Sequence, residues 1–510
     1  MQFLLACLPI LIIVILMIVF HWGADRAGAA GYLSALLIAL VFFGANPQLI
    51  AYAHGKALLL TIDVLAIIWA AFLFYRITDE AGAIRVIGNA LPHLTNDRCM
   101  QAILIGWVFA TFLQGFGGFG VPVAVIAPIM IGLGFSPLAS IIMASVGHAW
   151  GVTFGSLGSS FNALLAASNL PASVLAPPSA LFLGVAGLLS GMIVAQYAGG
   201  WSNLRRLLLP VIILGVVMGS VQYFVAVSGP WNISTLLAGI AGMAVGFPLA
   251  YRNAEHTNNN GDLDLRAVMI ALSAYAILIV VTLGVQLIQP LKNLLSGIEI
   301  EVLFPELSTT FGYVTPAGPG RNLVVFRHTG MVLFYVCILS YLVYKAFGLY
   351  QAGALGRILG GTMRRMIPSS VGIASMVTMA VIMELAGMTD TLARSLAEGV
   401  GPLYPLVAPW IGALGAFITG SNTNSNVVFT GLQMTTAELL GYSVPIILAA
   451  QTAGAALMSV VAPTKVVVGT STGGMSGREG EIIRKLFIYI GLLVLSISVM
   501  SMIGVWLTGK

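Results

Sequence analysis

Charged side chains are scarce in this sequence, because Asp, Glu, Lys and Arg together make up only 8% of its 510 residues. A soluble domain averages about a quarter. Apolar residues make up 59% of the chain, and the mean hydropathy is +1.00. A soluble core of this length cannot be so apolar. The composition therefore predicts an all-α polytopic membrane protein, in contact with lipid on its outer surface.

Cysteine is equally rare. The three cysteines, Cys7, Cys99 and Cys337, lie in or beside apolar runs and give neither a disulfide framework nor a metal-ligand spacing. The sequence contains no pattern of a catalytic triad or of a phosphate-cradling loop with its lysine. Its glycine-rich stretch 115–120 follows an apolar span, not the strand that a dinucleotide site requires. We therefore expect no enzyme activity, no metal and no cofactor.

The net charge of +5 is small for this length. We interpret it as the usual Lys/Arg excess on cytoplasmic loops and not as a nucleic-acid surface. Arg76, Arg85 and Arg98 mark one such loop, and Arg205/Arg206 mark another. These loops share the cytoplasmic side if both termini lie outside, which predicts a multi-pass protein of the plasma membrane.

Long apolar runs fill most of the chain. The first run, Phe3 to Phe20, has no basic segment before it and no small-residue cleavage site, so we expect a retained span. Runs of roughly 20 apolar residues give about 12 transmembrane helices. Two blocks, 116–160 and 420–467, are apolar but rich in Gly, Pro, Ser, Thr and Asn. Each is expected to hold a re-entrant hairpin and a broken helix.

The connection 289–329 is too long for an ordinary loop, so we expect an external lid or small extramembrane element there. The spans then divide into four parts. These are N-terminal scaffold helices (1–98), a first repeat core with its hairpin (99–200), scaffold helices with the external loop (201–366), and a second repeat core with its hairpin and the last helix (367–510). This division is compatible with a homo-oligomer.

Eight small polar residues, Thr419 to Asn426, interrupt the apolar chain between Leu403 and Val461. Non-helical backbone at membrane depth is tolerated only where it is buried in protein or lines a water-filled cavity. Such breaks point to the substrate site of a transporter. A second candidate, Gly115 to Gly120, carries four glycines whose backbone can approach a ligand. Its alternative interpretation is close helix packing through small residues.

The two stretches belong to an internal repeat. Residues 112–115 (Phe-Leu-Gln-Gly) resemble residues 417–420 (Phe-Ile-Thr-Gly), 305 positions on (420 − 115). Upstream, Thr78 and Thr389 each open a similar amphipathic stretch, and the loop charges put the two stretches on opposite sides of the membrane. Order, offset and orientation favour an inverted repeat, with the site where its halves meet, over chance similarity.

Three segments carry a resemblance to a known family: Gly117 to Val123, Thr419 to Asn426, and the Ala-Pro-Thr-Lys of 462–465. They resemble the lactate permease family, which is similar to a wider class of carboxylate and ion transporters with two inverted repeats. The resemblance implies secondary transport of lactate or glycolate, coupled to a proton and working by alternating access.

The chain resembles a divergent branch of that family. The better-known members carry Glu where Gln114 stands and Asp where Asn422 stands. Both candidate proton carriers are thus neutral here. Ser421-Asn422-Thr423 is also the tripeptide of sodium-coupled carboxylate carriers, so sodium coupling is an alternative.

Ionisable residues at membrane depth are functional hypotheses by default. His148 is the first candidate for carrying a proton, against a neutral hydrogen-bonded histidine. Lys465 would neutralise a substrate carboxylate, although a snorkelling lysine at a cytoplasmic helix end is the slightly favoured alternative. Asp63 and Glu384 are further proton-coupling candidates. An interhelical hydrogen bond is the favoured alternative for Asp63.

The sequence therefore predicts an importer of small 2-hydroxy monocarboxylates, with a carboxylate substrate and a proton or sodium as its partners. An ion-translocating subunit of a membrane enzyme complex is the rival from another class. The predicted substrate-binding residues are Gly115, Gly117, Gly118, Gly120, Ser421, Asn422, Thr423, Asn424, Asn426 and Lys465.

Overall fold

The computed structural model describes residues 2–90, 95, 97–118, 120–252, 264–320 and 323–508, and almost all of them are helical. The helices, in chain order, are α1 (Gln2–Ile18), α2 (Ala24–Phe42), α3 (Pro47–Glu80), α4 (Ala83–Ala90), α5 (Arg98–Ile103), the π-helix η2 (Leu104–Phe109), α6 (Ala110–Phe116), α7 (Val121–Gly132), α8 (Pro137–Ala149), α9 (Gly155–Ser168), α10 (Ala172–Val227), the 3-10 helix η3 (Trp231–Ile233), α11 (Ser234–Arg252), α12 (Leu265–Leu287), α13 (Gln289–Leu295), α14 (Thr329–Ala346), α15 (Ala354–Leu385), α16 (Met388–Val400), the 3-10 helix η4 (Gly401–Leu403), α17 (Tyr404–Thr419), α18 (Asn422–Leu439), α19 (Val444–Met458), α20 (Pro463–Thr472) and α21 (Glu479–Leu507).

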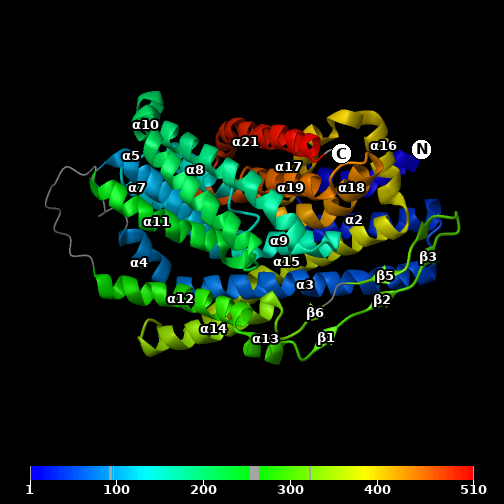
Figure 1. The fold of residues 1–510 in the computed structure, drawn as a ribbon, viewed down its shortest axis with the longest axis horizontal. Helices are drawn as coiled ribbons and strands as arrows, with labels where there is room; N and C mark the ends of the chain where they lie inside the picture. The colour runs from blue at the N-terminus through cyan, green and yellow to red at the C-terminus, as the bar shows by residue number, and fades with distance from the viewer. Residues whose placement is uncertain are drawn as a thin grey trace.

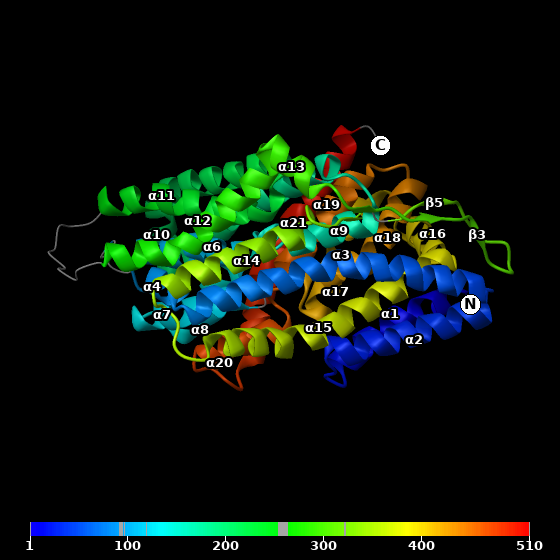
Figure 2. The same cartoon turned by 90° about the horizontal axis from the view of Figure 1, so that it is seen from below.

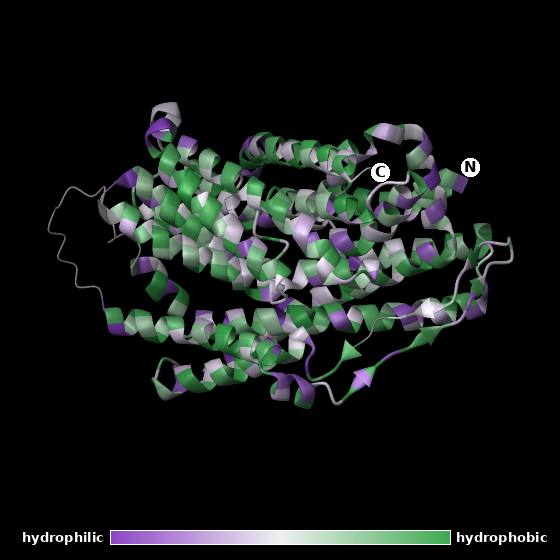
Figure 3. Ribbon diagram, in the orientation of Figure 1, coloured by the Kyte–Doolittle hydropathy of each residue, from purple (hydrophilic) through white to green (hydrophobic). Residues whose placement is uncertain are grey.

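Eleven helical segments of the described chain are long and apolar enough to cross a membrane, which confirms a polytopic membrane protein. Hydrophobic residues run along most of the helical surface, and hydrophilic ones are commoner near helix ends (Figure 3). The expected spans 178–198 and 207–227 are the two halves of α10, which bends back on itself at the non-helical residues Gly199 and Gly200, so that Gly184 lies against Gly219. Gly200 has φ +76°, so the bend uses a conformation that glycine adopts without strain.

Local sequence explains where the long helices begin. Asn46 accepts a hydrogen bond from the Leu49 N–H, and Pro47 opens the first turn of α3. In Figure 2, α2 lies beside α1 and α15, and α15 lies beside α3, in agreement with their packing contacts. These helices carry one apolar core, while a second and larger core surrounds the first hairpin.

Each predicted block contains a hairpin followed by a broken helix. In the first, α5–η2–α6 turns back into α7, and α8 breaks before α9. In the second, α17 turns back into α18, and α19 breaks before α20. The short amphipathic helices α4 and α16 precede the two units and lie at opposite ends of the long axis (Figure 1). The two units therefore have opposite orientations, as the inverted repeat predicts.

Close packing through glycine recurs at equivalent positions of the two units. A Cβ at Gly147 of α8 would collide with the Gly106 carbonyl, and one at Gly412 of α17 would collide with the Gln451 carbonyl. Gly412 follows Gly106 by 306 positions (412 − 106), and Gly454, which abuts the Pro409 carbonyl, follows Gly147 by 307 (454 − 147). Each hairpin's first arm thus lies in backbone contact with the first half of its own broken helix.

The second halves of the broken helices cross between the units. α9 of the first unit packs against α18 of the second, and α20 of the second packs against α7 of the first. The interface of the two units is therefore built from the return arm of one hairpin and the broken helix of the other.

The long connection 289–329 is an ordered element. After α13 it forms three antiparallel strand pairs of two residues each, in the pairings β1–β6, β2–β5 and β3–β4. The strands are β1 (Glu299–Ile300), β2 (Leu303–Phe304), β3 (Leu307–Ser308), β4 (Val314–Thr315), β5 (Gly318–Pro319) and β6 (Leu323–Val324). Near its tip, the Thr310 N–H donates to the Gly44 carbonyl (2.8 Å), so this ribbon lies over the α2–α3 turn.

Candidate functional site

The second hairpin turns within two residues. α17 ends at Gly420, which has φ +69°, and the Ser421 hydroxyl caps α18 by accepting from the Asn424 N–H at 3.2 Å. The polar run was expected to be a loop. Most of it instead forms the first turn of α18, because a left-handed glycine followed by a serine cap ends one helix and starts the next.

The break between α8 and α9 has unusual backbone geometry. Ser156 (φ 49°), Leu157 (φ 54°) and Gly158 (φ 77°) are successive left-handed residues, and all three are buried. Left-handed conformations at residues other than glycine cost energy and cluster at functional sites. The break therefore marks the centre of the molecule as a candidate site on geometry alone.

A buried hydrogen-bond network joins this break to the second hairpin. The Asn422 Nδ2 donates to Thr153 Oγ1 (3.0 Å), and the Thr153 hydroxyl lies 3.3 Å from Thr452 Oγ1 on α19. The Asn426 Nδ2 lies 2.9 Å from both Thr452 Oγ1 and the Ser160 carbonyl on α9. The network thus connects both halves of the repeat through neutral polar side chains.

Two acceptors in this network lack partners among the described residues. Asn422 Oδ1 and Gln451 Oε1 are buried and accept no hydrogen bond there. Gln451 uses its Nε2 to donate to Asn426 Oδ1 at 3.3 Å. A buried acceptor without a partner needs an explanation, and a bound donor or cation supplies one.

The predicted residues of α18 do not share one direction. Asn422 and Asn426 face the first unit, as does Thr423, whose hydroxyl lies 3.1 Å from Ser160 Oγ. Asn424 faces the opposite way, into a small cavity shared with α1 and α15. The structure thus brings three of the predicted residues to the interface of the units and sends Asn424 elsewhere, while Ser421 acts as a cap.

The first hairpin approaches the same break. A Cβ at Gly118 would collide with Ser156 Oγ, and Gln114 Nε2 lies 3.5 Å from that hydroxyl. The second unit repeats this arrangement, since a Cβ at Gly420 would collide with Thr464 Oγ1 just after the α19–α20 break. In each unit, a glycine near the hairpin tip therefore faces a hydroxyl that follows the break.

The other glycines of the first tip have different surroundings. Gly115 lies against the Leu236 backbone of α11, which favours the close-packing interpretation. Gly117 contacts its own hairpin, and Gly120 (φ +89°) lies beside Val468 of α20. Phe119 lies outside the described residues.

His148 and Lys465 flank the two breaks. His148 Nδ1 lies 2.6 Å from the Ala144 carbonyl, and a carbonyl can only accept, so Nδ1 carries the proton and Nε2 is left to bind another. The half-buried Lys465 donates to Ser459 Oγ at 3.0 Å. Lys465 is the cationic group of this junction and favours an anion there, and His148 would add a second positive charge if Nε2 took up a proton.

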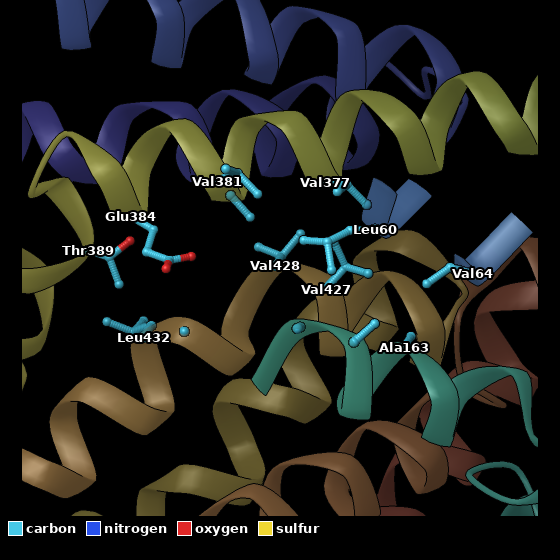
Figure 4. Close-up of a pocket in the computed structure, with 14 residues that line it drawn as sticks. Leu60, Val64, Ala163, Val377, Val381, Glu384, Thr389, Val427, Val428 and Leu432 are labelled. Carbon is cyan, nitrogen blue, oxygen red and sulfur yellow. The ribbon is translucent and has the colours of Figure 1, made fainter. Parts of the chain in front are cut away.

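Asp63 and Glu384 lie outside this junction. His328 Nε2 lies 2.6 Å from Asp63 Oδ1, so Asp63 makes the interhelical contact that was its favoured alternative. Glu384 is 3.0 Å from Lys56 Nζ and extends into an apolar pocket between α15 and α18 (Figure 4). Neither acid reaches the network around Asn422.

The helix α3 passes several cavities in succession. Asp63 lines one of about 340 Å³, Tyr75 lines a small space shared with Gly118 and Ser156, and Asp79 lines another of about 290 Å³. The first and last lie on either side of the α8–α9 break.

Among the described residues, no group of three or more His, Cys, Asp or Glu side chains is arranged to hold a metal.

Comparison with known proteins identifies the family. The sequence model of the L-lactate permease family matches residues 2–508. The chain belongs to the L-lactate permease family. Among the relatives of this permease, the glycolate permease GlcA of Escherichia coli K12 is 28% identical, over 94% of this chain and 91% of its own. The L-lactate permease of Bacillus subtilis 168 is 25% identical, over 92% and 90%.

One solved structure is similar to this chain at low identity. It is the Neisseria gonorrhoeae MtrF structure, with a TM-score of 0.48 and 15% identity over 88% of this chain and 84% of that one. Family membership makes this chain a membrane transport protein.

Proposed function

We propose that this permease imports small 2-hydroxy monocarboxylates, such as lactate and glycolate, by proton symport with alternating access across the plasma membrane. The observation that carries the proposal is the junction of the two repeats. There, the buried acceptor Asn422 Oδ1, which has no partner among the described residues, lies in the same break region as His148 and the cationic Lys465. The names of the family and its relatives support the substrate class.

Each part of the substrate has a counterpart at this junction. The carboxylate would approach Lys465 and His148, and the 2-hydroxyl would donate to Asn422 Oδ1. Protonation of His148 and binding of the anion favour each other, which couples the two without a resident carboxylate. Gln114 and Asn422 are neutral, so His148 is the titrating group that we assign to the coupling step.

The moving parts follow from the repeat. We assign the hairpin-and-broken-helix units within 99–200 and 367–510 to the transport core, and 1–98 and 201–366 to the scaffold. Loop charge puts both termini and the β ribbon outside. Alternating access would then open the contacts between α9 and α18 and those between α7 and α20 in turn.

Sodium is the second candidate for the coupling ion. Asn422 Oδ1 and Gln451 Oε1 are buried oxygen acceptors without partners in the described chain, and oxygen ligands suit hard cations. Sodium would replace the His148 proton without changing the substrate.

Purified protein in liposomes tests the proposal. With labelled L-lactate or glycolate outside, an imposed inward proton gradient should drive accumulation, and a sodium gradient should not. Accumulation driven by sodium alone would establish the second candidate. Failure to move either acid under both gradients would contradict the proposed function and return the rival, an ion-translocating subunit, to consideration.

A further inference from the structure

A polar cavity lies beside the junction and not in it. It has a volume of about 340 Å³ and is bounded by α3, α9, η3, α12, α13 and the start of α14. This volume exceeds what a small monocarboxylate needs. Val324 of β6 lines it as well, so the cavity adjoins the base of the β ribbon.

Positive charge in this cavity has no counterion among the described residues. Lys292 on α13 and Arg327 just before α14 both line it, and neither makes an ion pair there. The carboxylate that lines it, Asp63, is engaged by His328 at 2.6 Å. Thr329 adds the N-terminal end of α14, where the helix dipole favours an anion.

Two residues of the cavity wall also carry hydrogen-bonding groups without partners in the described chain. Thr282 is 2% exposed, and its hydroxyl has no hydrogen bond within the described chain. The indole N–H of Trp231 is likewise unpartnered there. Such groups are rare in protein interiors and indicate something bound. Cations with free donors around them fit a carboxylate better than a metal ion or a neutral solute.

The cavity adjoins the break of the first unit. Asn162, in its wall, donates to the carbonyl of Gly158, the last left-handed residue of the break, at 2.8 Å. Gly158 in turn packs against Asn232, another wall residue. A ligand in this cavity would therefore lie directly before the junction.

We propose that this cavity is a carboxylate-binding vestibule, in which Arg327 and Lys292 capture the anion before it moves to the junction. The identity of the anion rests on the proposed function, whereas the binding of a small carboxylate does not. The vestibule raises the local substrate concentration, so its effect falls on affinity and on salt dependence more than on turnover.

Substitution of both cations tests the vestibule in the full-length protein in liposomes. Arg327→Gln with Lys292→Gln should raise KM for lactate about tenfold, with kcat within about twofold. The KM of the unmodified protein should rise with ionic strength, and that of the double variant should not. Lys345→Gln, at the other end of α14, is the matched control and should change neither. An unchanged KM and salt dependence in the double variant would overturn the proposal.

Two further measurements keep the test decisive. Arg327→Lys with Lys292→Arg keeps both positive charges and should leave KM unchanged. If the double Gln variant does not fold, each single Gln variant should still raise KM, by less than the tenfold expected of the double variant. Fluorescence of Trp231, taken as the difference from Trp231→Phe, should respond to lactate and acetate, and Arg327→Gln should abolish the response. This readout needs no transport, so it tests the vestibule even if the proposed function fails. No response to either acid would refute the vestibule.

Discussion

Replacement of Asn422 by alanine offers the sharpest test of the substrate assignment. The side chain is 2% exposed, and its Oδ1 has no partner in the described structure, so it is free to accept from a substrate hydroxyl. Loss of that acceptor leaves the bound hydroxyl unpaired, at about 1–3 kcal/mol, or roughly tenfold in affinity. Propionate lacks the hydroxyl, so the substitution should lower its affinity much less.

The measurement is a ratio. Inhibition of labelled lactate uptake by unlabelled lactate and by propionate gives the preference for the 2-hydroxyl, and Asn422→Ala should reduce that preference about tenfold. Folding should survive, because Thr153 keeps Thr452 as a partner. Asn203→Ala, which removes a buried asparagine bonded to the Ala195 carbonyl, is the matched control. An unchanged ratio would remove Asn422 from the hydroxyl site, whatever the variant's overall rate.

Three other substitutions are informative. His148→Gln should leave lactate exchange intact but uncouple uptake from the pH gradient, and full gradient-driven uptake would make the histidine structural. Gly420→Ala should abolish transport because its Cβ would collide with a Thr464 side chain, whereas Gly441→Ala, with a similar φ of +68° and open space, should cost only stability of about 1 kcal/mol in thermal unfolding. His328→Ala should lower thermal stability by about 3 kcal/mol because it removes the imidazole that lies 2.6 Å from the buried Asp63 carboxylate, and Asp63→Asn in that background should recover part of the loss.

The sequence predicts the fold well where the signal is local. Runs of glycine, proline and small polar residues within apolar chain correctly place both hairpins and both breaks. The two spans 178–198 and 207–227 are also predicted correctly, because Gly199 and Gly200 form the turn between the two halves of α10. The β ribbon was expected only as an external element, since its two-residue strands are too short to show alternation.

The site is predicted less completely, because its contacts join distant parts of the chain. Asn422 was expected, but its partner Thr153 and the Thr452 hydroxyl beside Thr153 were not, and nothing in the chain order brings them together. One signal was available: Gln451 and Thr452 are adjacent polar residues within an otherwise apolar, alanine-rich helix. The pairing of Asp63 with His328, 265 positions away, has no such local signal.

The backbone contacts at Gly147 and Gly412 also have a mechanical consequence. With no side-chain layer between them, the first arm of each hairpin and the first half of its broken helix cannot slide or tilt independently. Each unit therefore moves as a rigid body that can bend only at its break, near Thr153 in the first unit and near Ser459 in the second. A substitution that separates either glycine contact, such as Gly147→Val, would let the hairpin arm and the broken helix move independently. A movement at one end of the unit would then no longer be transmitted to the other side of the membrane.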